Sequence, residues 1–216
     1  MDTFSACIAF GPLAIYLFLL GLVNLSRRPL VINGTRETLS LGLALAGLVI
    51  VGPMQLFMPQ EAAVRFGQLI WLLLVGFYVL SVTLFILLSR PRLIVYNISP
   101  DELRLALDAA ARRVDPDTAW TSTALSLPTS RVHLHIEPFP PLGNIALLAT
   151  GDDQSIGGWR RLEYALRDTL RETTVTPGAY GLWMLLMGAM MLAGLTFWVV
   201  DDPQTIAQGL ERMLSP

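Results

Sequence analysis

The sequence predicts an α-helical integral membrane protein with four transmembrane helices and a small α+β domain inserted between the third and the fourth. Three observations predict this class. First, the 216 residues are 53% hydrophobic and only 15% charged, whereas soluble domains carry about 25% charged residues. Second, four long apolar stretches contain no Asp, Glu, Lys, Arg or His. Third, the segment between the last two stretches has strand and helix periodicities of its own.

Each apolar stretch has the roughly 20 residues that a helix needs to cross about 30 Å of hydrocarbon. An ionisable side chain at the centre of a bilayer costs about 3 kcal/mol, so the absence of such residues favours membrane spans. Pro12 and Pro53 predict a bend in the first two helices, because proline donates no backbone hydrogen bond. The predicted spans are residues 6–25, 38–58, 67–89 and 178–200.

The arginines predict the orientation. The connection after the first span carries three of them, and the stretch after the third span begins with Arg90 and Arg92. The second connection has only Arg65, the N-terminus has none, and the tail has only Arg212. Because basic residues accumulate on the cytoplasmic side, we expect a plasma-membrane protein with both termini outside. The domain at 91–177 is then cytoplasmic, and residues 201–216 form an outer tail, in which apolar spacing suggests a short amphipathic helix.

The inserted domain is expected to have the order β-α-β-β-β-α. Its first helix has a capping box, in which Ser99 is the N-cap, Pro100 follows, and Glu102 stands three residues after the cap. The natural arrangement is a four-stranded antiparallel or mixed sheet with both helices on one face. The predicted strands cover 93–98, 121–127, 131–137 and 144–150, and the predicted helices cover 100–114 and 155–172.

One strand carries a candidate metal site. Side chains alternate along a strand, so His133, His135 and Glu137 share one face. Two histidines at this spacing, with a carboxylate beside them, are a possible set of ligands for a transition metal. The alternative is an ordinary polar face on a half-buried strand, and we favour that interpretation because no distant third ligand has a recognisable spacing.

The remaining chemistry is restricted by composition. All fifteen basic residues are arginine, a usage typical of a GC-rich bacterial genome, and the lack of lysine excludes Schiff-base and P-loop mechanisms. Cys7 is the only cysteine, so no disulfide forms within the chain. The net charge of −2 argues against a nucleic-acid partner. No catalytic set and no cofactor-binding motif is apparent.

The preferred hypothesis is therefore non-catalytic. It is a membrane-anchored interaction or regulatory module, embedded in the lipid bilayer, that binds a protein partner or a second copy of itself. The first alternative is a metal-dependent membrane enzyme that uses His133, His135 and Glu137. The second is an auxiliary subunit of a membrane transport or assembly complex, in which the helices themselves are the functional surface.

Overall fold

A computed structural model describes residues 3–54, 69–139, 142–175, 179–201 and 203–204. The contacts divide the chain into two compact units. The helical unit consists of Met1–Leu19, Thr38–Leu88 and Met184–Pro216. The sheet unit consists of Leu20–Glu37 and Ser89–Trp183.

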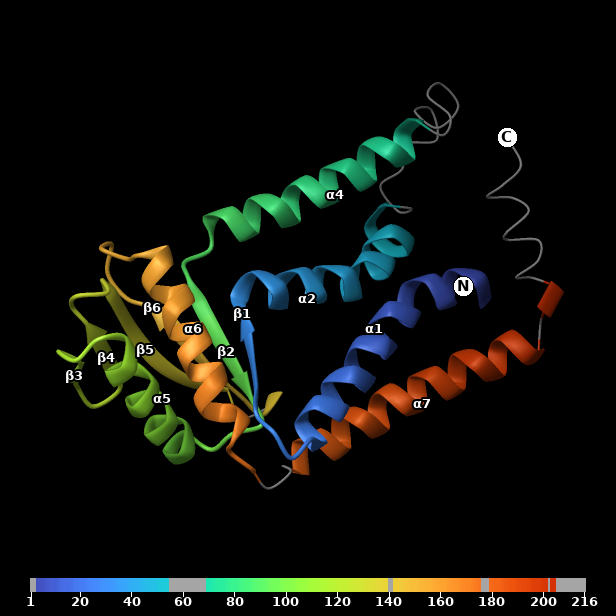
Figure 1. The fold of residues 1–216 in the computed structure, drawn as a ribbon. Coiled ribbons are helices and arrows are strands. Elements are labelled where there is room, and N and C mark those ends of the chain that lie inside the picture. The colour runs from blue at the N-terminus through green and yellow to red at the C-terminus, as the bar shows by residue number, and fades with distance from the viewer. Residues whose placement is uncertain (1–2, 55–68, 140–141, 176–178, 202, 205–216) are drawn as a thin grey trace. The chain divides into compact units, whose positions relative to one another are not determined.

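The apolar helices are α1, α2, α4 and α7 (Figure 1). Their bounds are Thr3–Leu25, Gly34–Val49, Leu69–Leu88 and Ala179–Asp201. By length and composition, three described helical segments are able to cross a membrane, namely α1, α7 and the segment Gly34–Gly52, which contains α2. In α4, which has 20 residues, the continuous part whose side chains are described is the apolar segment Leu72–Leu88.

The helices of the helical unit approach closely at small residues. A methyl group added to Gly47 in α2 would overlap the carbonyl oxygen of Ile8 in α1. The hydroxyl of Tyr78 in α4 donates a hydrogen bond to the carbonyl oxygen of Gly42 in α2, at 2.6 Å. Small residues permit such contacts between helix backbones.

The predicted bend at Pro53 lies in η1, the π-helical turn Ile50–Met54 that continues α2. A π-turn absorbs a missing backbone donor and changes the helix direction. The predicted ends at 55–58 and 67–68, and almost all of the expected tail helix, lie outside the described residues.

The sheet unit contains six strands in the order β1-β2-β6-β5-β4-β3, and every neighbouring pair is antiparallel. The strands in chain order are Leu30–Asn33, Arg92–Tyr96, Ala119–Trp120, Ala124–Leu127, Val132–Phe139 and Asn144–Ala149. The antiparallel form agrees with the expected fold class, but the number of strands does not.

Helices α5, Pro100–Val114, and α6, Ile156–Arg171, lie side by side over one face of this sheet (Figure 1). The predicted capping box at the start of α5 is confirmed, since Ser99 and Glu102 each accept a hydrogen bond from the other's backbone. The core lies between the helices and the sheet. Its fully buried large side chains include Leu103, Leu107, Leu125, Leu127, Leu134, Leu147, Leu162 and Leu166.

Two differences account for the extra strands. Leu30–Asn33, in the connection after α1, pairs with β2 as the edge strand β1, so the domain expected at 91–177 includes a segment from near the N-terminus. The strand expected at 121–127 begins only at Ala124, as β4, and β3 comes before it, at Ala119–Trp120; Thr121 donates a backbone hydrogen bond to Ala124 across the turn between them.

Both edges of the sheet are obstructed. On the β1 side, the guanidinium of Arg167 in α6 donates to the carbonyl oxygen of Val31 at 3.2 Å, while an ion pair with Glu163 at 2.7 Å holds the arginine. On the other side, β3 contributes only two residues. Short strands and edge groups that are already bonded prevent a further strand from pairing with a sheet.

Candidate functional site

The most distinctive exposed feature of the sheet unit is a groove between α5 and β3. We call it the α5–β3 surface, and it is lined by Asp101, Arg104, Leu105, Asp108 and Trp120. The α5 residues follow one another at spacings of three, one and three, so they share a face of the helix that is separate from its core residues. Leu105 lies among these polar residues with 75% of its surface exposed.

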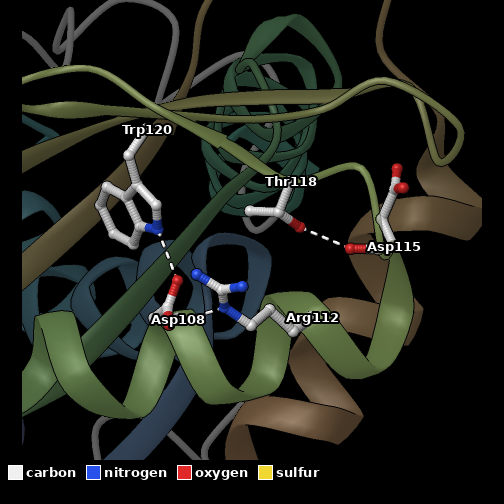
Figure 2. A network of polar contacts seen from close by, with 5 residues as sticks. All are labelled: Asp108, Arg112, Asp115, Thr118 and Trp120. Carbon is white, nitrogen blue, oxygen red and sulfur yellow. Dashed lines mark hydrogen bonds and ion pairs between the residues drawn. The ribbon is translucent and has the colours of Figure 1, made fainter.

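Trp120 is held in one orientation within the groove. Its indole Nε1 donates to Oδ1 of Asp108 at 2.7 Å, and Oδ2 of the same carboxylate accepts from Nε of Arg112 at 2.9 Å (Figure 2). The guanidinium carbon of Arg104 lies 5.2 Å from the centroid of the indole ring, a cation–π distance. The hydrogen bonds from Arg112 and from Trp120 lower the pKa of Asp108, so the carboxylate stays charged at neutral pH.

Asp115 fixes the chain that leads from α5 to β3. Its carbonyl oxygen accepts from the hydroxyl of Thr118 at 2.6 Å (Figure 2). Its buried carboxylate accepts from the backbone N–H groups of Asp117 at 3.1 Å and Ser130 at 3.0 Å. One side chain therefore ties the end of α5 to the loop before β5 and positions β3 together with Trp120.

Two effects oppose each other at Asp115. Burial would raise the pKa of its carboxyl group, because a low-dielectric environment disfavours the charged form. Hydrogen bonds from Ser130, Asp117 and Thr129 outweigh the burial, and the pKa lies below its usual value. The folded unit thus contains a buried carboxylate that is stabilised by N–H and O–H donors, and no described arginine or histidine forms an ion pair with it.

The predicted metal residues lie on β5 with the expected alternation. Val132 and Leu134 are buried in the core, while His135 and Glu137 are exposed on the opposite face. Nδ1 of His133 is 2.8 Å from the hydroxyl of Ser126 on β4.

The structure does not bring His133, His135 and Glu137 together. A strand rises about 3.3 Å per residue, so the first and the last of these residues stand about 13 Å apart. Their cross-strand neighbours include Ser126, Ala124 and Ala146, none of which adds a carboxylate or thiolate. Within the described part of the chain, no group of three His, Cys, Asp or Glu residues is arranged to hold a metal ion.

Sequence patterns had not identified the α5–β3 surface. The available signal was Leu105, an apolar residue outside the helical stripe of Leu103, Leu107 and Ala110. Trp120, in an otherwise polar stretch, was a second signal. The pairing of the two depends on the tertiary contact between α5 and β3.

Comparisons of the chain with protein-family models, with curated proteins and with solved structures give no match.

Proposed function

We propose that the chain is a plasma-membrane protein with four spans, whose sheet unit lies in the cytoplasm and binds a protein partner at the α5–β3 surface. Partner binding at this surface is supported by Leu105, a large apolar side chain that is exposed. It lines the same groove as Trp120, whose indole is fixed by a hydrogen bond, and Arg104, whose guanidinium lies over that indole ring.

Exposed apolar side chains support the membrane part of the proposal. Leu43 in α2, Leu72 in α4, and Met190 and Val200 in α7 are each more than 70% exposed. Soluble monomers rarely expose contiguous apolar surface of this kind. The 20 residues of α4 span about 30 Å at 1.5 Å per residue, which is sufficient for a fourth crossing.

The pairing of β1 with β2 supports the orientation. It joins the connection after α1 to the domain after α4, so these two segments have to lie on the same side of a membrane. The arginine distribution assigns the same two segments to the cytoplasm. Two independent features therefore favour one topology.

The obstructed sheet edges support binding through side chains. Addition of a partner strand is disfavoured at β1 by Arg167 and at β3 by its length. Tryptophan and arginine are the residue types that most often dominate binding energy in protein interfaces. The fitting partner is a cytoplasmic protein that inserts an apolar side chain between Leu105 and Trp120 and places polar groups opposite Asp101 and Asp108.

The test uses the full-length chain in its native membrane, with a photo-crosslinking residue at Asp101, next to the groove. Three backgrounds are compared: the unchanged chain, Leu105→Asp, and the matched control Ile156→Asp, whose side chain is 72% exposed on α6. We expect one dominant cross-linked protein, formed at least about tenfold less in Leu105→Asp and unchanged in Ile156→Asp.

Equal yields in all three backgrounds, or no cross-link, would contradict the proposal. A cross-link to a second copy of the chain would replace the partner by a homo-oligomer. Mass spectrometry of the cross-linked band separates these outcomes.

A further inference from the structure

A second cavity of the sheet unit also lies near the start of α5, beside the end of α1, the start of β6 and the start of α7. This cavity, which we call the asparagine pocket, has a volume of about 300 Å³. Its polar lining includes Asn24, Asn97 and Asn144, and its wall includes Glu102, Gly143 and Tyr180. All six residues belong to the sheet unit.

Two of the asparagines hold the pocket together. The buried carboxamide of Asn24 donates to the carbonyl oxygens of Leu20 at 3.1 Å and Leu142 at 3.2 Å. Asn97 donates from its side chain to the carbonyl oxygen of Ser26, and from its backbone to that of Gly143 at 3.0 Å. Gly143, with φ of +60°, leaves room for Asn24, since a methyl group there would come within 2.9 Å of Oδ1 of Asn24.

Asn144 has no such structural role. The residue as a whole is only 7% exposed, and it lines the pocket. Its carboxamide forms no hydrogen bond with any residue that the structure describes. Because the amide lines the pocket and no described residue occupies it, a polar group that enters the pocket has a hydrogen-bond partner there.

The carboxylate of Glu102 favours a positively charged ligand in the pocket. Among the described residues that line it, Glu102 is the only Asp, Glu, Arg or His. Oε2 of Glu102 accepts the hydrogen bonds of the capping box from the backbone and hydroxyl of Ser99, at 3.1 and 2.7 Å, which leaves Oε1 for a ligand. A carboxylate repels phosphates and carboxylates, but it forms a charge-assisted hydrogen bond with an ammonium group.

We infer that the asparagine pocket binds a primary ammonium group. Oε1 of Glu102 and Oδ1 of Asn144 accept its hydrogen bonds, and the half-exposed ring of Tyr180 lies at the wall for the attached methylenes. The pocket is bounded by Asn24 in the last turn of α1 and by Tyr180 in the first turn of α7.

The ammonium has two possible sources. The headgroup of an aminophospholipid lies at the end of a membrane-spanning helix, so this source rests on the membrane placement proposed above. A free small amine in the cytoplasm has the same chemistry and does not require that placement.

Two variants test the inference in the full-length protein. Glu102→Gln retains the capping box, because glutamine also serves at the third helical position, but it removes the charge. Asn144→Ala removes the unpartnered amide. The control is Glu172→Gln, an exposed acid at the end of α6 that does not line the pocket.

One arm measures lipid. The detergent-purified proteins are incubated with equal amounts of phosphatidylethanolamine and phosphatidylcholine of identical chains, and the retained lipid is counted by native mass spectrometry. We expect the unchanged chain and the control to prefer phosphatidylethanolamine, whose ammonium donates hydrogen bonds that the quaternary headgroup lacks. The preference should fall at least about tenfold in both pocket variants.

The other arm measures the midpoint temperature of unfolding with ethanolamine or choline added. A shift with ethanolamine alone that is abolished by Glu102→Gln, without any lipid preference, assigns the pocket to a free amine. The inference is overturned if neither arm distinguishes the two ligands, or if the pocket variants behave like the control. Because the amine arm is independent of the α5–β3 surface and of membrane placement, its failure is distinguishable from failure of the proposed function.

Discussion

Individual polar side chains in the sheet unit form hydrogen bonds that link segments distant in the chain. Asp115 joins the end of α5 to the loop before β5, and Arg167 joins α6 to the edge of β1. Asn97 joins the end of β2 to the connection after α1. Each is a polar group on the boundary of the core, where a lost partner is costly because water does not replace it.

Asp115→Asn is expected to lower the midpoint temperature of unfolding at neutral pH, because the amide keeps one acceptor oxygen but puts an NH2 donor opposite the second backbone N–H group. The pKa of Asp115 in the folded chain is below its usual value of 3.8. Its stabilising contribution is therefore complete above that value and disappears as the pH falls through the lower, folded-state pKa.

The difference in midpoint between the unchanged chain and Asp115→Asn should accordingly be constant from pH 5 to 8 and shrink below about pH 4. Asp117→Asn is the control, since the side chain of Asp117 is exposed and only its backbone joins the network. A difference that does not change with pH would mean that the variant acts by packing and not by charge.

At the scale of elements, β1 changes the composition of the sheet, because it adds a segment from near the N-terminus. It has four residues, and it is stabilised by its ladder with β2 and by the burial of Val31 among core residues. An isolated strand of this length is not stable in water, so its structure depends on the sheet that it joins.

A disulfide between Val31→Cys and Val95→Cys, in a Cys7→Ala background, tests this pairing. The two residues are directly opposite in the register, and the carbonyl of Val31 is bonded to Arg167, as expected for a non-hydrogen-bonded pair. Such pairs have Cα atoms about 4.5 Å apart, which suits a disulfide.

We expect oxidation of the full-length protein to convert this double variant into a cross-linked form with altered mobility on a denaturing gel. The control pairs Val31→Cys with Ile94→Cys, whose side chain points to the opposite face of β2. Cross-linking of the control to the same extent would show that β1 does not hold this register.

At the scale of the whole molecule, four apolar helices join one sheet unit, which includes the end of α1 and the beginning of α7. With the four membrane crossings that we propose, the alternation of helix directions places all the segments of the sheet unit on one side of the membrane. This consequence does not depend on the arginine distribution, although the arginines select which side it is.

Cysteine labelling of intact cells tests the topology. Single cysteines replace Arg28, Asp153 and Gln204, all exposed, in the Cys7→Ala background. A membrane-impermeant maleimide is expected to label position 204 in intact cells and positions 28 and 153 only after lysis. Labelling of 28 and 153 before lysis, with 204 protected, would reverse the orientation, whereas different behaviour of 28 and 153 would contradict the shared sheet.

The local signals that the sequence carries were sufficient for several elements. The capping box of Ser99 and Glu102 locates the start of α5, and the alternation at Val132–Ile136 places His135 and Glu137 on the outer face of β5. These features succeed because capping and side-chain period depend on residues only two to four apart. Absence of charge likewise identifies the apolar helices without any tertiary information.

The remaining features were decided by tertiary structure. Leu30–Asn33 has no alternation, and its partner Arg92–Tyr96 is about 60 residues away, so only the formation of the sheet makes it a strand. Equally, neither Leu105 beside Trp120 nor the unpartnered Asn144 beside Glu102 is visible in a local pattern. By itself, the sequence determined the helices, their caps and the faces of the strands, because those depend on near neighbours. Only the tertiary structure decided which strands form the sheet and where both candidate binding sites lie, because these depend on contacts between distant segments.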